Sequence, residues 1–201
     1  MYEESMTEES EFEGHFKKVY LEVLEKFPWV GKDEVTLKYN PLIFIISFLD
    51  VNPYILMGTG QLVKSPYLLV SDDFFTVFDD EQKKAIIAHE LGHYKRSKDY
   101  SLEKLTMHAK FKDQLFSFYS LNHDYKEMLR NSDKKLGRKI DRLEKWRLLD
   151  EMHADNKAVK AGYKEPLLSA LERTLKEYGD CIGDPGRNMV VERVKNIKKR
   201  S

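Results

Sequence analysis

The spacing of apolar positions changes partway along the chain. Residues 15–27, HFKKVYLEVLEKF, place apolar side chains at helical spacing, and Pro28 ends the predicted helix. Runs rich in β-branched and aromatic residues then predict short strands: EVTLKY, LIFIISFL, PYILMG and YLLVS. From Asp79 onward the pattern is almost entirely helical. The expected fold class is α+β, with a small N-terminal β-sheet and a C-terminal helical region.

Length and charge limit the classes of function. A chain of 201 residues is expected to form a single domain. Its expected parts are an acidic tail over about 1–12, the sheet and first long helix over about 14–98, and helices over about 99–201. Lys and Arg together equal Asp and Glu together at 34 each. The chain therefore has no excess of positive charge that would indicate a nucleic-acid partner.

Cysteine usage and hydropathy favour a cytoplasmic protein. Cys181 is the single cysteine, so the chain cannot form an internal disulfide. The N-terminus lacks the apolar core of a secretory signal. The longest apolar run, residues 41–49, is far shorter than the roughly 20 residues of a membrane-spanning helix. We therefore expect no transmembrane segment, and the pattern indicates no particular oligomeric state.

Two histidines four residues apart lie on a well-marked predicted helix. Asp79 and Gln82 have the spacing of a capping box, which predicts a helix running through EQKKAIIAHELGHYK. On this helix His89, Glu90 and His93 fall within one arc, beside an apolar stripe that is expected to face the core. Two neutral imidazoles at this spacing can hold one tetrahedral metal ion. Glu90 can then accept a proton from a water at that ion.

Such a metal ion needs a third protein ligand, and two carboxylates are candidates. Asp99 lies six residues after the second histidine, but Arg96 stands where a chain that turns back to the metal would favour glycine. Glu151 lies on a second predicted helix, LLDEMHADNKAVKAGY. A His-His-Glu set leaves a fourth position open for water, as in catalytic zinc sites. Glu151 is the preferred third ligand, and Asp99 is the alternative.

Neighbouring residues also bear on this site. On a helical projection Glu151 and Asp155 share one arc with two alanines, whereas Asp150 and His153 are expected on the opposite side. Asp155 is well placed to accept a hydrogen bond from the free nitrogen of a ligand histidine. Gly92 weakens the first helix, so it indicates a close backbone contact with an element that the sequence does not identify.

The two segments together resemble the HtpX and CAAX prenyl endopeptidase family of gluzincin metallopeptidases. FFTVFDDEQKKAIIAHELGHYKRSKD followed by EMHADNKAVKAGY pairs an HExxH motif with a later ExxAD helix. The resemblance implies a zincin-like fold in which His89, His93 and Glu151 bind one Zn²⁺ ion. It further implies that Glu90 is the general base and acid and that Asp155 supports a ligand. It also implies strands beside the cleft, in NPYILMGTG and YLLVSDDFF, where an extended substrate could pair.

The chain departs from that family at two points. Many members have membrane-spanning helices, whereas residues 100–145 here are charged and aromatic and are expected to form a helical cap. Many relatives also have a His-Pro shortly before a Glu-Arg. The corresponding residues here are Asp184-Pro185 and Glu192-Arg193. Arg193 is a candidate to stabilise an oxyanion, and the alternative is a surface ion pair.

The expected function is that of a zinc-dependent endopeptidase acting on peptide or protein substrates. Because the His-Pro is missing, a second hypothesis is a zinc-binding scaffold that holds a partner without cleaving it. A third is a regulatory protease resembling the phage-repressor-cleaving group, although that group ends its helix motif in Ala-Asn rather than the Ala154-Asp155 found here.

Overall fold

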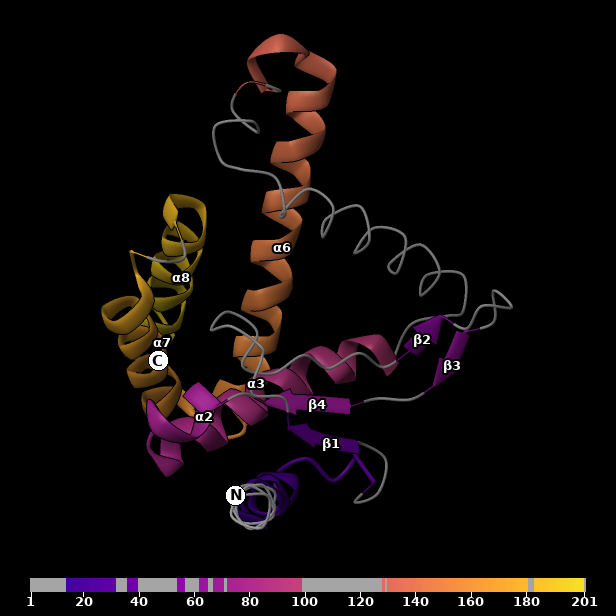
Figure 1. Cartoon of the computed structure of the whole chain (residues 1–201), viewed down its shortest axis with the longest axis vertical. Coiled ribbons are helices and arrows are strands. Elements are labelled where there is room, and N and C mark those ends of the chain that lie inside the picture. Colours follow the sequence, from indigo (N-terminus) through magenta and orange to yellow (C-terminus); the bar gives the residue numbers. More distant parts are fainter. Residues whose placement is uncertain are drawn as a thin grey trace, which may run out of the picture.

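The computed structural model describes most of the expected helices and short pieces of the strand region. The described residues are 14–31, 36–39, 54–56, 62–64, 67–70, 72–98, 128, 130–180 and 183–200. After a helix over residues 14–24, the elements are β1 (Thr36–Tyr39), β2 (Tyr54–Leu56), β3 (Leu62–Lys64), β4 (Tyr67–Val70), α2 (Asp72–Thr76), α3 (Asp80–Lys98), α6 (Lys134–Lys160), α7 (Lys164–Tyr178) and α8 (Gly183–Lys198). Figure 1 shows α6 extending away from α3, with α7 and α8 beside its lower part.

The expectation of an α+β fold built on a small N-terminal β-sheet is wrong. Helices make up most of the described chain, and the strands described there form two separate two-stranded pairs instead of one sheet. β1 pairs with β4 in parallel, and β2 pairs with β3 in antiparallel orientation. The apolar pattern indicates local extended conformation, but it does not specify which segments exchange backbone hydrogen bonds. The strand expected within 42–49 lies outside the described residues.

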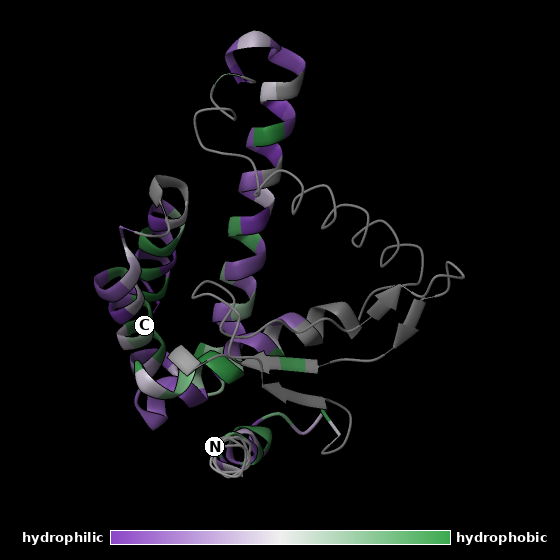
Figure 2. Ribbon diagram, viewed as in Figure 1, coloured by the Kyte–Doolittle hydropathy of each residue, from purple (hydrophilic) through white to green (hydrophobic). Residues whose placement is uncertain are grey.

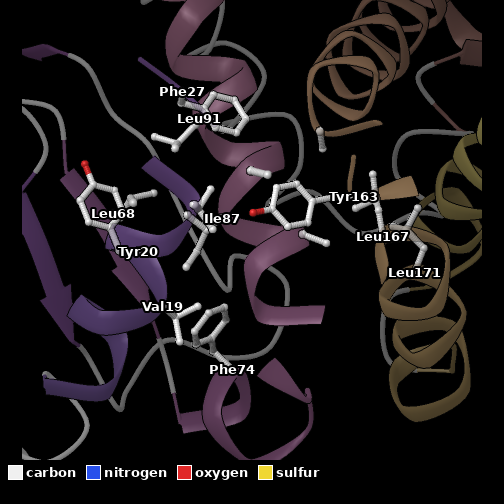
Figure 3. Close-up of a cluster of buried hydrophobic side chains, with 14 of the residues drawn as sticks. Val19, Tyr20, Phe27, Leu68, Phe74, Ile87, Leu91, Tyr163, Leu167 and Leu171 are labelled. Carbon is white, nitrogen blue, oxygen red and sulfur yellow. The ribbon is translucent and has the colours of Figure 1, made fainter. Parts of the chain in front are cut away.

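The N-terminal helix and α3 bury apolar faces in one shared core. Side chains of the N-terminal helix recur there at helical spacing: Phe16, Val19, Tyr20 and Val23. The same cluster takes side chains from β4, α2, α3 and α7 (Figure 3): Leu68, Phe74, Ile87, Leu91, Leu167 and Leu171. Ile87 and Leu91 are fully buried, which confirms the predicted apolar stripe of α3. The remaining arc of α3 is thereby left for the two histidines.

The start of α3 is held by the predicted capping box. The backbone N–H of Gln82 donates to Oδ1 of Asp79 at 2.9 Å, and the backbone N–H of Asp79 donates to Oε1 of Gln82 at 3.1 Å. These reciprocal bonds satisfy two N–H groups that a helix terminus otherwise leaves unpaired. The Gln82 side chain also donates to the hydroxyl of Ser169 on α7 at 2.8 Å. The capping box therefore starts α3, and its Gln82 side chain also connects α3 to α7.

Backbone contact between α3 and α6 explains Gly92. A Cβ atom on Gly92 would lie 2.8 Å from the carbonyl oxygen of Ala154 and 2.9 Å from its Cα atom. Ala154 and Ala158 are both fully buried on the facing side of α6. The predicted second helix is the C-terminal part of α6, which begins earlier, at Lys134, within the expected helical cap. Small residues on both helices therefore permit the close approach that the site requires.

We expect Gly92→Ala to destabilise the protein by about 1–3 kcal/mol, because the added methyl group meets backbone atoms that cannot rotate aside. The higher helix propensity of alanine offsets about 1 kcal/mol of this cost. Gly14→Ala is the matched control, since nothing lies within 4 Å of its added Cβ atom. Urea unfolding followed by circular dichroism measures both variants. A Gly92→Ala protein as stable as the wild type would contradict the contact.

The longest of these helices is polar. α6 has 27 residues, and Figure 2 shows its projecting part coloured mainly as hydrophilic. The described side chains there include exposed Arg138, Lys139, Asp141 and Arg142. Across the ranges given above, no helix combines the length and the apolar character needed to span a membrane.

Candidate metal centre

Successive turns of α3 bring two histidine rings together. Nε2 of His89 lies 3.2 Å from Nε2 of His93, and the ring planes are nearly perpendicular, at 89°. Glu90 lies beside them, with Oε1 3.8 Å from Nε2 of His89. Within the described part of the chain, these residues form a group whose possible ligand atoms all lie within 4.8 Å of one another. The predicted HExxH arc is therefore present as a cluster of side chains that could hold a metal ion.

Glu151 of α6 faces both imidazoles. Its Oε2 lies 3.3 Å from Nε2 of His89, and its Oε1 lies 3.8 Å from Nε2 of His93. Ligand atoms about 2.0–2.1 Å from one tetrahedral ion are separated from each other by about 3.3 Å. The two imidazole nitrogens therefore have the spacing of two ligands of a single ion, and Glu151 approaches each of them with a different carboxylate oxygen. The residues present fit a divalent metal.

The charge of the cluster also suits a cation. Four carboxylates surround the two imidazoles in the described residues: Glu90, Asp150, Glu151 and Asp155. Burial raises the pKa of Glu151, but the Arg193 guanidinium and the two histidines outweigh it and hold that pKa well below its usual value. An ionised, half-buried carboxylate beside two imidazoles is a ligand type that binds divalent metals.

Asp155 fixes the orientation of His89. Its Oδ1 lies 2.8 Å from Nδ1 of His89, and the Asp155 side chain is fully buried. Burial and Arg193 lower the pKa of His89, but contacts with Asp155 and Glu151 outweigh these effects and raise the pKa to about 10. An ionised carboxylate only accepts hydrogen bonds, so the Nδ1 atom carries a proton and donates it to Asp155. The Nε2 atom, which faces His93 and Glu151, is then the atom that can bind a metal once the metal displaces its proton.

Arg193 of α8 joins this cluster from a distant part of the sequence. Its Nε and Nη2 atoms donate to the two Asp155 oxygens at 2.9 and 2.7 Å, and its Nη1 atom lies 3.0 Å from Oε2 of Glu151. The residue is 8 % exposed, so the predicted surface ion pair is wrong and the ion pair is buried. Burial lowers the pKa of Arg193, and the two carboxylates raise it above its ordinary value. Arg193 therefore offsets part of the negative charge around the histidines.

Asp150 was expected on the opposite side of the helix from Glu151, and this expectation is wrong. Its Oδ2 lies 3.4 Å from Nδ1 of His93, and the residue is 8 % exposed. On a helical projection Asp150 is only about 40° from Ala154, which packs against α3. That angle was a usable signal in the sequence. The angle from Glu151 was the wrong criterion for deciding which residues of α6 face α3, because the contact with α3 spans a wider arc of α6.

Some predicted features cannot be placed. Asp99, the alternative ligand, and residues 100–127 of the expected cap lie outside the described residues. Asp184 and Pro185 fall within the first turn of α8, but their side chains are not described. The structure thus brings together His89, Glu90, His93, Glu151, Asp155 and Arg193, and adds Asp150 to them.

Comparison with known proteins identifies one family. The sequence model of peptidase family M48 matches residues 50–180, which is more than half of the chain and includes both α3 and the histidine-facing part of α6. No curated protein and no solved structure matches the chain.

Proposed function

The chain belongs to peptidase family M48, and we propose that it is a zinc-dependent endopeptidase of the HtpX and CAAX prenyl endopeptidase type, acting on peptides or unfolded proteins. The observation that carries this proposal is the close approach of the two imidazole Nε2 atoms on α3, with the Glu151 carboxylate of α6 facing both. Family membership implies metal-dependent cleavage of peptide bonds, and the donor set favours zinc because two imidazoles and a carboxylate are a common catalytic zinc set.

In the proposed site His89, His93 and Glu151 hold one zinc ion and leave a position for water. The ion would supply Lewis-acid polarisation of the scissile carbonyl and would lower the pKa of the attacking water. Glu151 enters from α6 and faces both rings, whereas Glu90 follows His89 on α3. This difference supports Glu151 as the ligand and leaves Glu90 for proton transfer.

Glu90 is the proposed general base and acid. Its side chain is 15 % exposed and its Oε1 lies beside the histidine pair, where it can reach both solvent and the reacting water. The carboxylate takes a proton from the water and then delivers that proton to the leaving amine. Asp155 meanwhile keeps the proton on Nδ1 of His89, so that Nε2 stays available as a ligand.

Arg193 has a positioning role in this proposal rather than a direct role in oxyanion stabilisation. Its three guanidinium nitrogens contact Asp155 and Glu151, and a guanidinium held by two carboxylates is poorly placed to move toward charge that develops on a substrate. The guanidinium instead fixes the two carboxylates relative to each other and to His89.

The test of the proposed function is cleavage of an unfolded protein by the purified, zinc-loaded chain. We expect fragments with new amino termini, detected by mass spectrometry. Chelation should stop the cleavage, and added zinc should restore it. A preparation that binds zinc stoichiometrically and leaves every peptide of a random library intact would refute an endopeptidase.

The third ligand can be tested by zinc affinity alone. We expect Glu151→Gln to weaken zinc binding by at least the 10- to 100-fold that is typical when a group supporting a metal site is lost, because a neutral amide is a poor ligand. Asp99→Asn should bind zinc as tightly as the wild type. Competition with a chromophoric chelator measures both dissociation constants. The reverse ranking would assign the third ligand to Asp99.

A zinc-binding scaffold without activity is the second candidate. Two observations favour it: Asp184-Pro185 stands where many relatives have His-Pro, and the arginine that follows is occupied by Asp155 and Glu151. A scaffold would retain peptides on the immobilised, zinc-loaded protein and release them uncut. A cytoplasmic location remains a prediction that rests on the single cysteine.

A further inference from the structure

The side chain of Asp150 lies beside Nδ1 of His93, the ring nitrogen that the proposed metal site does not use. Glu151 approaches Nε2 of His93, with Oε1 at 3.8 Å, and Asp150 approaches Nδ1, with Oδ2 at 3.4 Å. The two carboxylates are adjacent in sequence on α6. The His93 ring therefore lies between them, with one of its nitrogens toward each.

The same arrangement occurs around the other histidine. Asp155 lies 2.8 Å from Nδ1 of His89, and Glu151 lies 3.3 Å from its Nε2. Glu151 thus approaches the inner nitrogen, Nε2, of both rings. A separate aspartate of α6 approaches the outer nitrogen, Nδ1, of each ring. The ExxAD motif on this helix includes Asp155 but not Asp150, whose contact with His93 depends on the packing of α3 against α6.

We propose that Asp150 is a positioning residue for His93, holding its ring so that Nδ1 carries the proton and Nε2 faces the metal. Carboxylates that accept from the outer nitrogen of a metal-binding histidine fix its tautomer and increase its basicity. Asp150 is as buried as Arg193, at 8 % exposure, so water competes little for this contact. The proposal rests on the proposed metal site, with His93 as one of its ligands.

Replacement of Asp150 by alanine and by asparagine separates this role from a purely structural one. Asparagine has nearly the same shape and keeps an acceptor oxygen for the Nδ1 proton but loses the charge, whereas alanine loses both. We expect the zinc dissociation constant to rise by about 10- to 100-fold in Asp150→Ala and by less in Asp150→Asn. Asp141→Asn is the matched control, because Asp141 lies on the same helix and pairs with Arg130. This control should bind zinc normally.

Nuclear magnetic resonance of the histidine rings supplies the second readout. In the zinc-loaded wild type the Nδ1 proton of His93 should give a slowly exchanging, downfield signal. This signal should be lost or shifted in Asp150→Ala, while the Nδ1 proton of His89 remains in place on Asp155. Circular dichroism checks that each variant is folded, and the nearly isosteric Asp150→Asn keeps the test valid if the alanine variant does not fold.

Two results would overturn the inference. One is wild-type zinc affinity in Asp150→Ala, and the other is weakened binding with an unchanged His93 Nδ1 signal. Both measurements are independent of peptide cleavage. A wild-type protein that binds zinc but cleaves nothing would refute the endopeptidase and leave this inference standing. An active wild type with normal zinc affinity in Asp150→Ala would refute the inference alone.

Discussion

Replacement of Glu90 by alanine should abolish peptide hydrolysis while zinc remains bound. Proton transfer by a positioned side chain contributes about 100- to 10,000-fold to the rate of a catalysed reaction. We therefore expect kcat/KM to fall by at least about 100-fold. Glu90 lies next to the histidine pair without being one of the three proposed ligands, so the metal content should not change. The measurement is kcat/KM on a fluorogenic peptide, with zinc quantified in the same samples.

Glu81→Ala is the control for this variant. Glu81 lies on the same helix, is 63 % exposed and pairs with Lys84 in solvent, so its loss should leave the activity unchanged. Hydrolysis that persists in the Glu90 variant at the wild-type rate would rule out the proposed proton transfer. If Glu90→Ala loses its zinc as well, then Glu90 acts as a ligand, and the assignment of Glu151 must be revised.

Replacement of Arg193 by methionine should produce the largest loss of stability among the variants considered. Arg193 is buried and bridges Asp155 and Glu151, with contacts of 2.7–3.0 Å. Removal of one partner from a buried ion pair costs about 3–5 kcal/mol, because the remaining charges stay buried without compensation. At roughly 2–4 °C per kcal/mol for a chain of this size, the Tm of the metal-free protein should fall by about 6–20 °C.

The metal state and two further variants sharpen this measurement. Zinc should recover part of the lost Tm, since a bound cation compensates the same carboxylates. Arg193→Lys should be intermediate because an ammonium group cannot make the bidentate contact with Asp155. Arg187→Met is the matched control on α8: its side chain is 56 % exposed and its nearest ion-pair distance is 3.8 Å. Equal Tm values for Arg193→Met and Arg187→Met would show that the buried contacts contribute nothing.

The helical part of the site was predictable because its signals are local. Reciprocal hydrogen bonds between Asp79 and Gln82 depend on a spacing of three residues, and the shared arc of His89 and His93 depends on a spacing of four. Both distances are fixed by the pitch of a helix. The pattern on the second helix placed Glu151 and Asp155 on one arc for the same reason, and the structure brings both of them to His89.

Strand pairing was not predictable in the same way. The segments containing β1, β2 and β4 were correctly expected to be extended, but β4 pairs with β1 and β2 pairs with β3, so no common sheet forms in the described residues. A run of apolar residues determines which side chains prefer burial, whereas its partner depends on the hydrogen bonds left available by the rest of the chain. That information is not local.

By itself the sequence determined that one helix presents His89, Glu90 and His93 on a single face and that a second helix offers Glu151. Tertiary structure alone decided what surrounds them. Gly92 meets the backbone of Ala154, Asp150 reaches the outer nitrogen of His93, and Arg193 arrives from α8 to join two carboxylates. The physical reason is that a helical repeat sets the direction of each side chain relative to its own axis, whereas the approach and rotation of neighbouring helices follow from packing of the whole core.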